Sequence, residues 1–105
     1  MARQKLSAEA RKQALAKLSG WSEVQGREAI TRKFVFKDFN AAFGFMTRAA
    51  LVAEKMDHHP EWFNVWAFVT VDLVTHDVKA ISDFDAKLAK KMQALAARLG
   101  AEAVK

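Results

Sequence analysis

The chain has 105 residues and a mass of 11.8 kDa, which is enough for one small domain with a single core. Hydrophobic residues make up 51% and charged residues 28%, a balance typical of a folded globular protein. The absence of cysteine excludes disulfide scaffolds, cysteine-based zinc sites, iron–sulfur clusters and thiol nucleophiles. The sequence has neither a signal peptide nor an apolar run of membrane-spanning length, so we expect a cytoplasmic protein, nuclear as well if eukaryotic, with no membrane partner.

The net charge of +5 is distributed unevenly along the chain. Residues 1–18 and 87–105 each carry +4, whereas residues 19–86 carry −3. Residues 54–85, which include all three histidines, carry −5 and are a poor site for phosphate. The basic ends fit solvated helix faces, so we expect no direct contact with nucleic acid. Binding of nucleic acid by the basic ends is a weaker alternative, and it would show steep salt dependence.

The first predicted element is a helix over residues 7–18, with Ser7 as its N-cap and Gly20 after its end. The alternating residues on either side of Gly26 predict a β-hairpin over residues 21–37 that turns near this glycine. Asp38 then caps a second helix that ends near Met56. The apolar positions of this helix follow three-and-four spacing, and the predicted buried face comprises Phe39, Ala42, Phe43, Met46, Ala49, Ala50 and Ala53.

Pro60 disfavours helical geometry at the residue before it, so the chain must be extended at His59. Residues 61–75 are rich in aromatic and β-branched side chains but too long for one strand, which predicts a tight turn near residues 64–67. In a single strand, the odd-numbered residues 65–73 would share one face. Ser82 and Asp85 have the spacing of a capping box and begin a third helix with an apolar stripe that reaches Leu99. The order α-β-β-α-β-β-α predicts one α+β domain over residues 1–105, with helices laid over an antiparallel sheet.

The histidines are the best candidates for chemistry, because the glycines do not cluster into a phosphate-binding loop and no serine has the flanks of a hydrolase nucleophile. His58 and His59 follow the second helix and His76 follows the last strand, so the two loops can meet at one rim of the sheet. Imidazoles with an ordinary pKa of about 6.5 suit acid–base catalysis near neutral pH. Metal binding is a second alternative, although adjacent side chains on extended backbone point apart. Structural histidines that cap or pack loops are the third alternative.

Four carboxylates lie near the histidines in the sequence: Glu54, Asp57, Asp77 and Asp85. A carboxylate beside an imidazole fixes its tautomer, although Glu54 could instead pair with a surface lysine and Asp85 could merely cap the third helix. Trp62 would wall a planar ligand or belong to the core. Trp66 and Phe68 are expected on the sheet face away from the helices, where exposed aromatic side chains indicate a partner surface.

One extended pattern carries a family resemblance. Residues 54–65 read EKMDHHPEWFNV and are followed by Thr75-His76 and then by Asp85. This pattern resembles the pterin-4a-carbinolamine dehydratase family, which also includes the dimerisation cofactor of a homeodomain transcription factor. The similarity covers roughly residues 7–89 and includes Gly20-Trp21, Gly26-Arg27, residues 36–40 and residues 42–48.

The resemblance implies a four-stranded antiparallel sheet with three helices on one face, and dimers that extend the sheet and pair into tetramers through helices. The implied reaction removes water from the pterin substrate, 4a-hydroxytetrahydrobiopterin, and gives quinonoid dihydropterin. This step recycles tetrahydrobiopterin for the aromatic amino acid hydroxylases. The family requires no metal and no organic cofactor.

The resemblance also assigns residues. The segments expected to contact the pterin substrate contribute Asp57, His58, His59, Val74, Thr75, His76 and Asp77. His58 and His76 would form the acid–base pair and His59 would orient the pterin, which makes all three candidate catalytic residues. Glu54, Trp62 and Asp85 would support the pocket. Which histidine acts as the acid stays open.

Two departures from the family pattern bear on function. Val74 stands where a small polar residue is familiar, which removes a side-chain hydrogen bond to the substrate. Val78 stands where vertebrate members have cysteine, so the transcriptional partnership is not carried over. The alternative function from another class is a non-catalytic binding module or coactivator with the same fold, whose partner would be an aromatic amino acid hydroxylase or a transcription factor.

Overall fold

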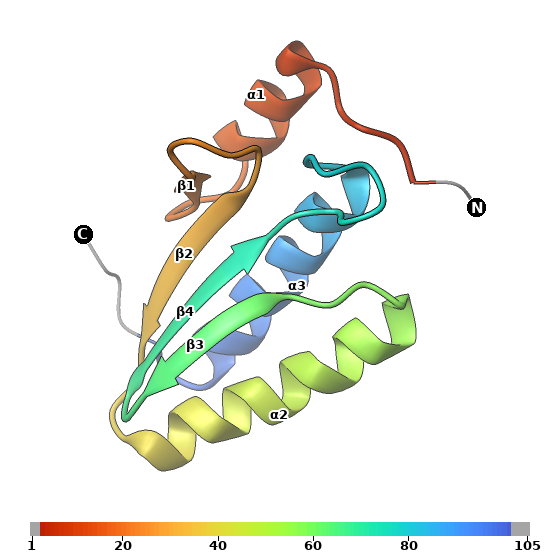
Figure 1. The fold of residues 1–105 in the computed structure, drawn as a ribbon. Helices are drawn as coiled ribbons and strands as arrows, with labels where there is room; N and C mark the ends of the chain where they lie inside the picture. Colours follow the sequence, from red (N-terminus) through yellow and green to blue (C-terminus); the bar gives the residue numbers. More distant parts are fainter. Residues whose placement is uncertain (1–2, 102–105) are drawn as a thin grey trace.

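The computed structural model describes residues 3–101 and has the predicted order of elements. Its helices and strands are α1 (Ala8–Ala16), β1 (Ser22–Glu23), β2 (Ile30–Val35), α2 (Phe39–Met56), β3 (Glu61–Val65), β4 (Phe68–Leu73) and α3 (Asp83–Arg98). The strands form one antiparallel sheet in the order β1-β2-β4-β3, with β3 at one edge (Figure 1). Three helices and a four-stranded antiparallel sheet confirm the predicted α+β class.

The core lies between the sheet and the two long helices, and Figure 1 shows α3 running behind the strands. Alternate residues of β2 and β4 point into it, and those of lowest exposure are Ile30, Phe34, Val69, Val71 and Leu73. α2 meets them with Phe45 among small alanines, and α3 meets them with Leu88 and Met92. α1 adds the half-buried Leu15. The core therefore supports the sheet from one face and leaves the other face open.

The helix ends follow the polar residues that the sequence offers for them. The side chains of Ser7 and Asp38 accept hydrogen bonds from the first turns of α1 and α2, as predicted. Ser82 and Asp85 form the predicted capping box at the start of α3. α2 ends at Asp57, whose left-handed backbone (φ 52°) turns the chain toward the strands. Capping thus fixes both helix ends that lie next to the histidines.

The predicted buried face of α2 is wrong at both of its first aromatic positions. Phe39 and Phe43 are 49% and 55% exposed and contact each other, with ring centroids 5.7 Å apart, outside the core. The predicted Ala50 is also exposed, whereas the predicted Ala42, Ala49 and Ala53 are buried. Phe45 and Ala41 complete the buried stripe, which repeats about every four residues. Phe39 and Phe43 lie on the neighbouring stripe. The sequence does not distinguish the two stripes, because the apolar face of this helix is broad.

No helix within residues 3–101 is long and apolar enough to cross a membrane.

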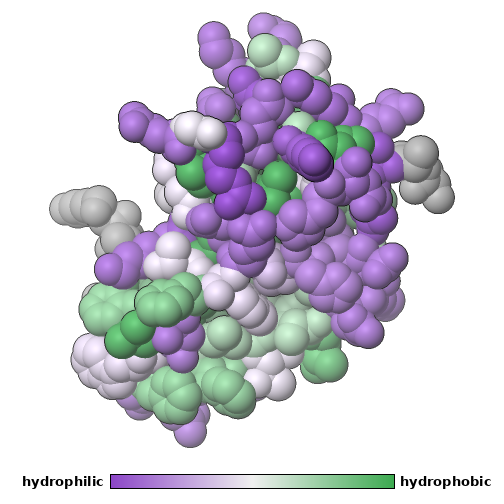
Figure 2. All heavy atoms as spheres, in the orientation of Figure 1, coloured by the Kyte–Doolittle hydropathy of each residue, from purple (hydrophilic) through white to green (hydrophobic). Residues whose placement is uncertain are grey.

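The predicted turn between the last two strands is confirmed at residues 66–67, where Trp66 adopts a left-handed backbone (φ 49°). The side chain of Asn64 donates hydrogen bonds to the carbonyls of Trp66 and Phe68 at 3.1 and 2.9 Å and holds the turn. The turn interrupts the odd-numbered pattern, so Val65 is exposed while Val69 is buried. Figure 2 shows apolar side chains gathered where β3 turns into β4 and α2 begins; the exposed residues there include Phe39, Phe43, Val65 and Trp66.

Candidate active site at the rim of the sheet

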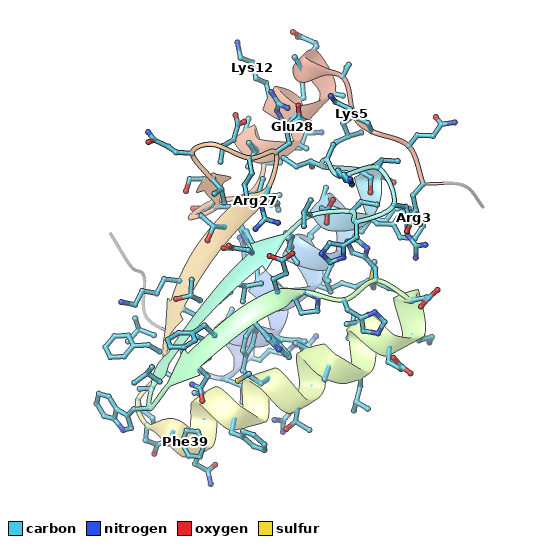
Figure 3. All side chains as sticks on the ribbon, in the orientation of Figure 1. Arg3, Lys5, Lys12, Arg27, Glu28 and Phe39 are labelled. Atoms are coloured by element: carbon cyan, nitrogen blue, oxygen red, sulfur yellow. The ribbon has the colours of Figure 1, made fainter. Side chains whose placement is uncertain are left out.

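The loop after α2 and the loop after β4 lie next to each other, as predicted. The evidence is the side chain of Arg3, which donates to the backbone carbonyls of Met56 and Asp57 on one loop. The same guanidinium lies 3.7 Å from the carboxylate of Asp77 on the other loop and stacks over the Phe84 ring of α3. The end of α2, the end of β4 and the start of α3 therefore form one rim, with Arg3 beside it (Figure 3).

His58 lies inside this rim and is only 5% exposed. Its Nε2 atom is 2.6 Å from Oδ1 of Asp85, a fully buried carboxylate at the start of α3. The second oxygen of Asp85 accepts hydrogen bonds from the Thr75 hydroxyl at 2.7 Å and from the Ser82 backbone N–H at 2.9 Å. Asp85 therefore does more than cap the helix, because it joins three chain segments around His58. The side chain of Thr75, an expected substrate contact, is buried in the same network.

His59 faces the opposite way and is 55% exposed. Its Nε2 atom lies 2.8 Å from Oε1 of Glu54, one turn back on α2. Glu54 thus pairs with a histidine rather than with a surface lysine. The adjacent histidines point apart, as their spacing predicts, and each has its own carboxylate.

His76 is 63% exposed and lies 2.8 Å, through Nε2, from Oε2 of Glu61 at the start of β3. Arg27, on the loop between β1 and β2, holds the same carboxylate with two hydrogen bonds of 3.0 and 3.2 Å. These bonds from Arg27, and then the contact with His76, lower the pKa of Glu61 from its ordinary value of 4.5 to about 2. The carboxylate in turn raises the pKa of Arg27. Glu61 is therefore ionised throughout the neutral range.

The sequence alone did not identify Glu61 and Arg27 as site residues. Arg27 lies 34 residues before Glu61, and no local pattern joins them. The available signals were the position of Glu61 directly after His59-Pro60 and the Gly26-Arg27 pair within the family resemblance. Gly26 adopts a left-handed backbone (φ 85°), which lets the loop turn immediately before Arg27.

A hollow of about 370 Å³ opens beside His76, a volume within the range of ligand pockets. Its lining residues are Arg27, Glu28, Val74, His76 and Lys79, and Figure 3 shows Arg27 and Glu28 on the β1–β2 loop. His58 and His59 do not line it, so the structure brings His76 and Val74 together but leaves the other two histidines outside this hollow. Glu61 also borders a second, shallower hollow of about 200 Å³ beside the half-buried Trp62.

No group of three or more histidine, aspartate or glutamate side chains in the described part of the chain is arranged to hold a metal ion. The arrangement is instead three imidazole–carboxylate pairs of different exposure. A carboxylate on one ring nitrogen orients the ring and fixes its tautomer. This geometry suits proton transfer by a histidine that faces a ligand.

Comparison with known proteins agrees with the pattern of residues at the rim. A family model described as "Pterin 4 alpha carbinolamine dehydratase" matches residues 4–95. The chain belongs to this family. A relative from Bradyrhizobium sp. strain BTAi1, assigned to the pterin-4-alpha-carbinolamine dehydratases, is 62% identical over 96 residues, which are 91% of this chain and 97% of the relative. A relative with the same assignment from Brucella ovis is 55% identical over 96 residues and 99% of its own length.

A solved structure shows the same fold. The crystal structure of a transcriptional coactivator/pterin dehydratase from Brucella melitensis superposes on this pterin dehydratase family member with a TM-score of 0.87. The two chains are 54% identical, and the match covers 89% of this chain and 99% of the other. Family and fold are therefore shown together for nearly the whole chain.

Proposed function

We propose that the protein removes water from 4a-hydroxytetrahydrobiopterin, giving quinonoid dihydropterin, and so takes part in tetrahydrobiopterin recycling for aromatic amino acid hydroxylation. The observation that carries this proposal is the exposed His76, which Glu61 holds beside a hollow and which directly follows Thr75 of the buried His58–Asp85 network. Family membership supplies the substrate class.

The proposed reaction is an elimination by acid–base catalysis. The C4a–O bond breaks as an imidazolium gives its proton to the leaving hydroxyl, which departs as water. N5 loses its proton to a neutral imidazole, and a C4a=N5 double bond forms. Positioned proton transfer of this kind contributes about a hundredfold to ten-thousandfold in rate. The elimination changes no oxidation state, so it needs no oxidant or reductant.

His76 and His58 are the proposed acid–base pair, and His59 orients the pterin. His76 is the accessible member, whereas His58 is nearly buried, so a pterin would reach only the ring edge that Asp85 leaves free. Asp57, Val74 and Asp77 border the same rim and would contact the substrate, with backbone groups serving where Val74 lacks a polar side chain. Glu54 and Asp85 support the pocket by orienting two of the imidazoles.

The proposal is tested by generating the 4a-carbinolamine with a pterin-dependent hydroxylase and following quinonoid dihydropterin by absorbance. Wild-type protein should accelerate its appearance, and His76→Ala should lower turnover by at least about a hundredfold. The matched control is Lys90→Ala on the exposed surface of α3, which should retain wild-type turnover. Equal turnover by His76→Ala and wild type would contradict the assigned role, provided both unfold at the same temperature.

A second candidate is a non-catalytic binding module or coactivator. The observation that favours it is the exposed apolar surface around Phe63, Val65 and Trp66, which are 67%, 53% and 59% exposed. Its partner would be a hydroxylase, a transcription factor or a further copy of the chain. Absence of any acceleration by folded wild-type protein would favour this candidate over the enzyme.

A further inference from the structure

The contact between Glu61 and His76 specifies which ring nitrogen carries a hydrogen. Nε2 of His76 lies 2.8 Å from Oε2 of Glu61. Because the pKa of this carboxyl is about 2, it is ionised at neutral pH and accepts hydrogen bonds only. Nε2 must therefore be the donor in both the neutral and the protonated imidazole, and Nδ1 is left to exchange a proton.

Arg27 fixes the orientation of the carboxylate that accepts from Nε2 of His76. Its Nη1 and Nη2 atoms, which only donate, each bond one carboxylate oxygen of Glu61, at 3.0 and 3.2 Å. The fork fixes the plane of the carboxylate and so the direction from which Oε2 meets the imidazole. Arg27 and His76 also line the same hollow, so the clamp would lie beside a ligand bound there.

Several charged residues surround Glu61 and His76, and Arg27 offsets the repulsion between two of the carboxylates. Glu61 lies directly opposite Asp72 in the β3–β4 ladder, and two carboxylates in such positions repel each other. Arg27 is attracted to both and offsets this repulsion. Glu28 and Lys79 also border the hollow, and Glu28 is paired with Lys5 and Arg11. Asp77, next to His76 in the chain, faces Arg3.

We infer that Glu61, clamped by Arg27, is a positioning residue that holds His76 as the Nε2–H tautomer and leaves Nδ1 as the nitrogen that exchanges protons with the substrate. This inference rests on the proposed function for the identity of the substrate. Arg27, Glu61 and His76 are 42%, 40% and 63% exposed, and ion pairs this exposed contribute little to folding. The clamp should therefore affect mainly the tautomer and the turnover, and the stability only slightly.

The tautomer is read directly from the ring nitrogens of ¹⁵N-labelled His76 by NMR, above the pH at which the ring becomes neutral. Wild type should be the Nε2–H form. In Glu61→Gln, Arg27 retains the amide oxygen and the amide NH₂ turns toward His76, so the population should shift to the Nδ1–H form. The matched control, Asp72→Asn, removes the same charge from the opposite strand and should leave the tautomer unchanged. A wild-type Nδ1–H form, or an unshifted Glu61→Gln, would overturn the inference.

The kinetic arm uses the same variants in the carbinolamine assay. Removing a residue that orients another typically costs about 10-fold to 100-fold in activity, so Glu61→Gln should lower kcat by this factor with little change in KM. Wild-type kcat in Glu61→Gln would overturn the role of Nδ1. If wild type itself is inactive, the proposed function fails, and the NMR arm still decides whether Glu61 positions His76.

Discussion

At the residue scale, the three histidines differ mainly in the surroundings of their carboxylate partners. His58 and Asp85 are buried together, whereas the pairs of His59 and His76 are open to water. Removing a buried carboxylate leaves several hydrogen-bond donors without an acceptor, whereas water takes the place of an exposed carboxylate. Substitutions at the three carboxylates should therefore separate effects on folding from effects on chemistry.

Asp85→Ala should lower the free energy of unfolding by about 3–5 kcal/mol, because it leaves His58, the Thr75 hydroxyl and the Ser82 N–H without their acceptor. Chemical denaturation measures the change. The control is Asp83→Ala in the same helical turn, whose side chain is 65% exposed and pairs with Lys87; this variant should lose less than about 1 kcal/mol. Equal losses in the two variants would contradict the buried network.

Glu61 makes a small part of the stability of the fold dependent on pH, because its ion pairs are exposed and contribute little to folding. Its pKa is lowered from 4.5 to about 2, so its contribution is fully present above about pH 4.5 and is lost as the pH falls toward 2. Wild type should therefore lose more stability than Glu61→Gln over this interval, measured as the difference in melting temperature at each pH. Parallel curves for the two proteins would show that the carboxylate has the same pKa in the unfolded chain.

At the element scale, the order of helices and strands was predictable because the signals for it are local. Ser7, Asp38 and Ser82 cap the helices that follow them, and Gly26 and Pro60 interrupt periodic segments. The buried stripe of α2 was predicted correctly at Ala42, Ala49 and Ala53 but not at Phe45, because most positions on that helix are apolar or small and only tertiary packing selects the stripe. The meeting of the two histidine loops was predictable from topology. The Arg27–Glu61 clamp depends instead on the strand order, which brings Arg27 on a distant loop within reach of Glu61.

The β3–β4 hairpin depends on Asn64 rather than on a turn glycine. Asn64→Ala removes two hydrogen bonds to the carbonyls of the turn and should cost about 1–3 kcal/mol in unfolding free energy. Trp66→Gly relieves a left-handed backbone and should cost less than Asn64→Ala, despite the loss of the contact with Phe68. Denaturant titration of both variants checks the order, and a larger loss in Trp66→Gly would contradict it.

At the scale of the whole molecule, large apolar side chains exposed within residues 3–101 lie at the sheet edge and along α2. Phe63, Val65 and Trp66 lie at the edge strand and its turn, and Phe43 and Leu51 lie on the outer face of α2. Strand edges and apolar helix faces are both suited to pairing with a second copy. We expect a homodimer built on the sheet and a homotetramer built on α2.

The assembly prediction is tested by sedimentation. The double variant Phe43→Glu and Leu51→Glu places charges on the outer face of α2, where the two side chains are 55% and 69% exposed, and should reduce a tetramer to a dimer without unfolding it. Lys90→Glu on α3 is the control for added negative charge. An unchanged mass in the double variant would exclude α2 as the contact between dimers.

The central claim is that the rim of the sheet beside His76 is the pterin site. It is tested most directly by titrating ¹⁵N-labelled protein with a stable 7,8-dihydropterin and mapping the amide signals that move. The account predicts shifts at Arg27, Val74 and His76, which line the hollow of about 370 Å³. Shifts confined to the lysine-lined groove between α1 and α3, at Lys17, Lys87 and Lys90, would contradict it.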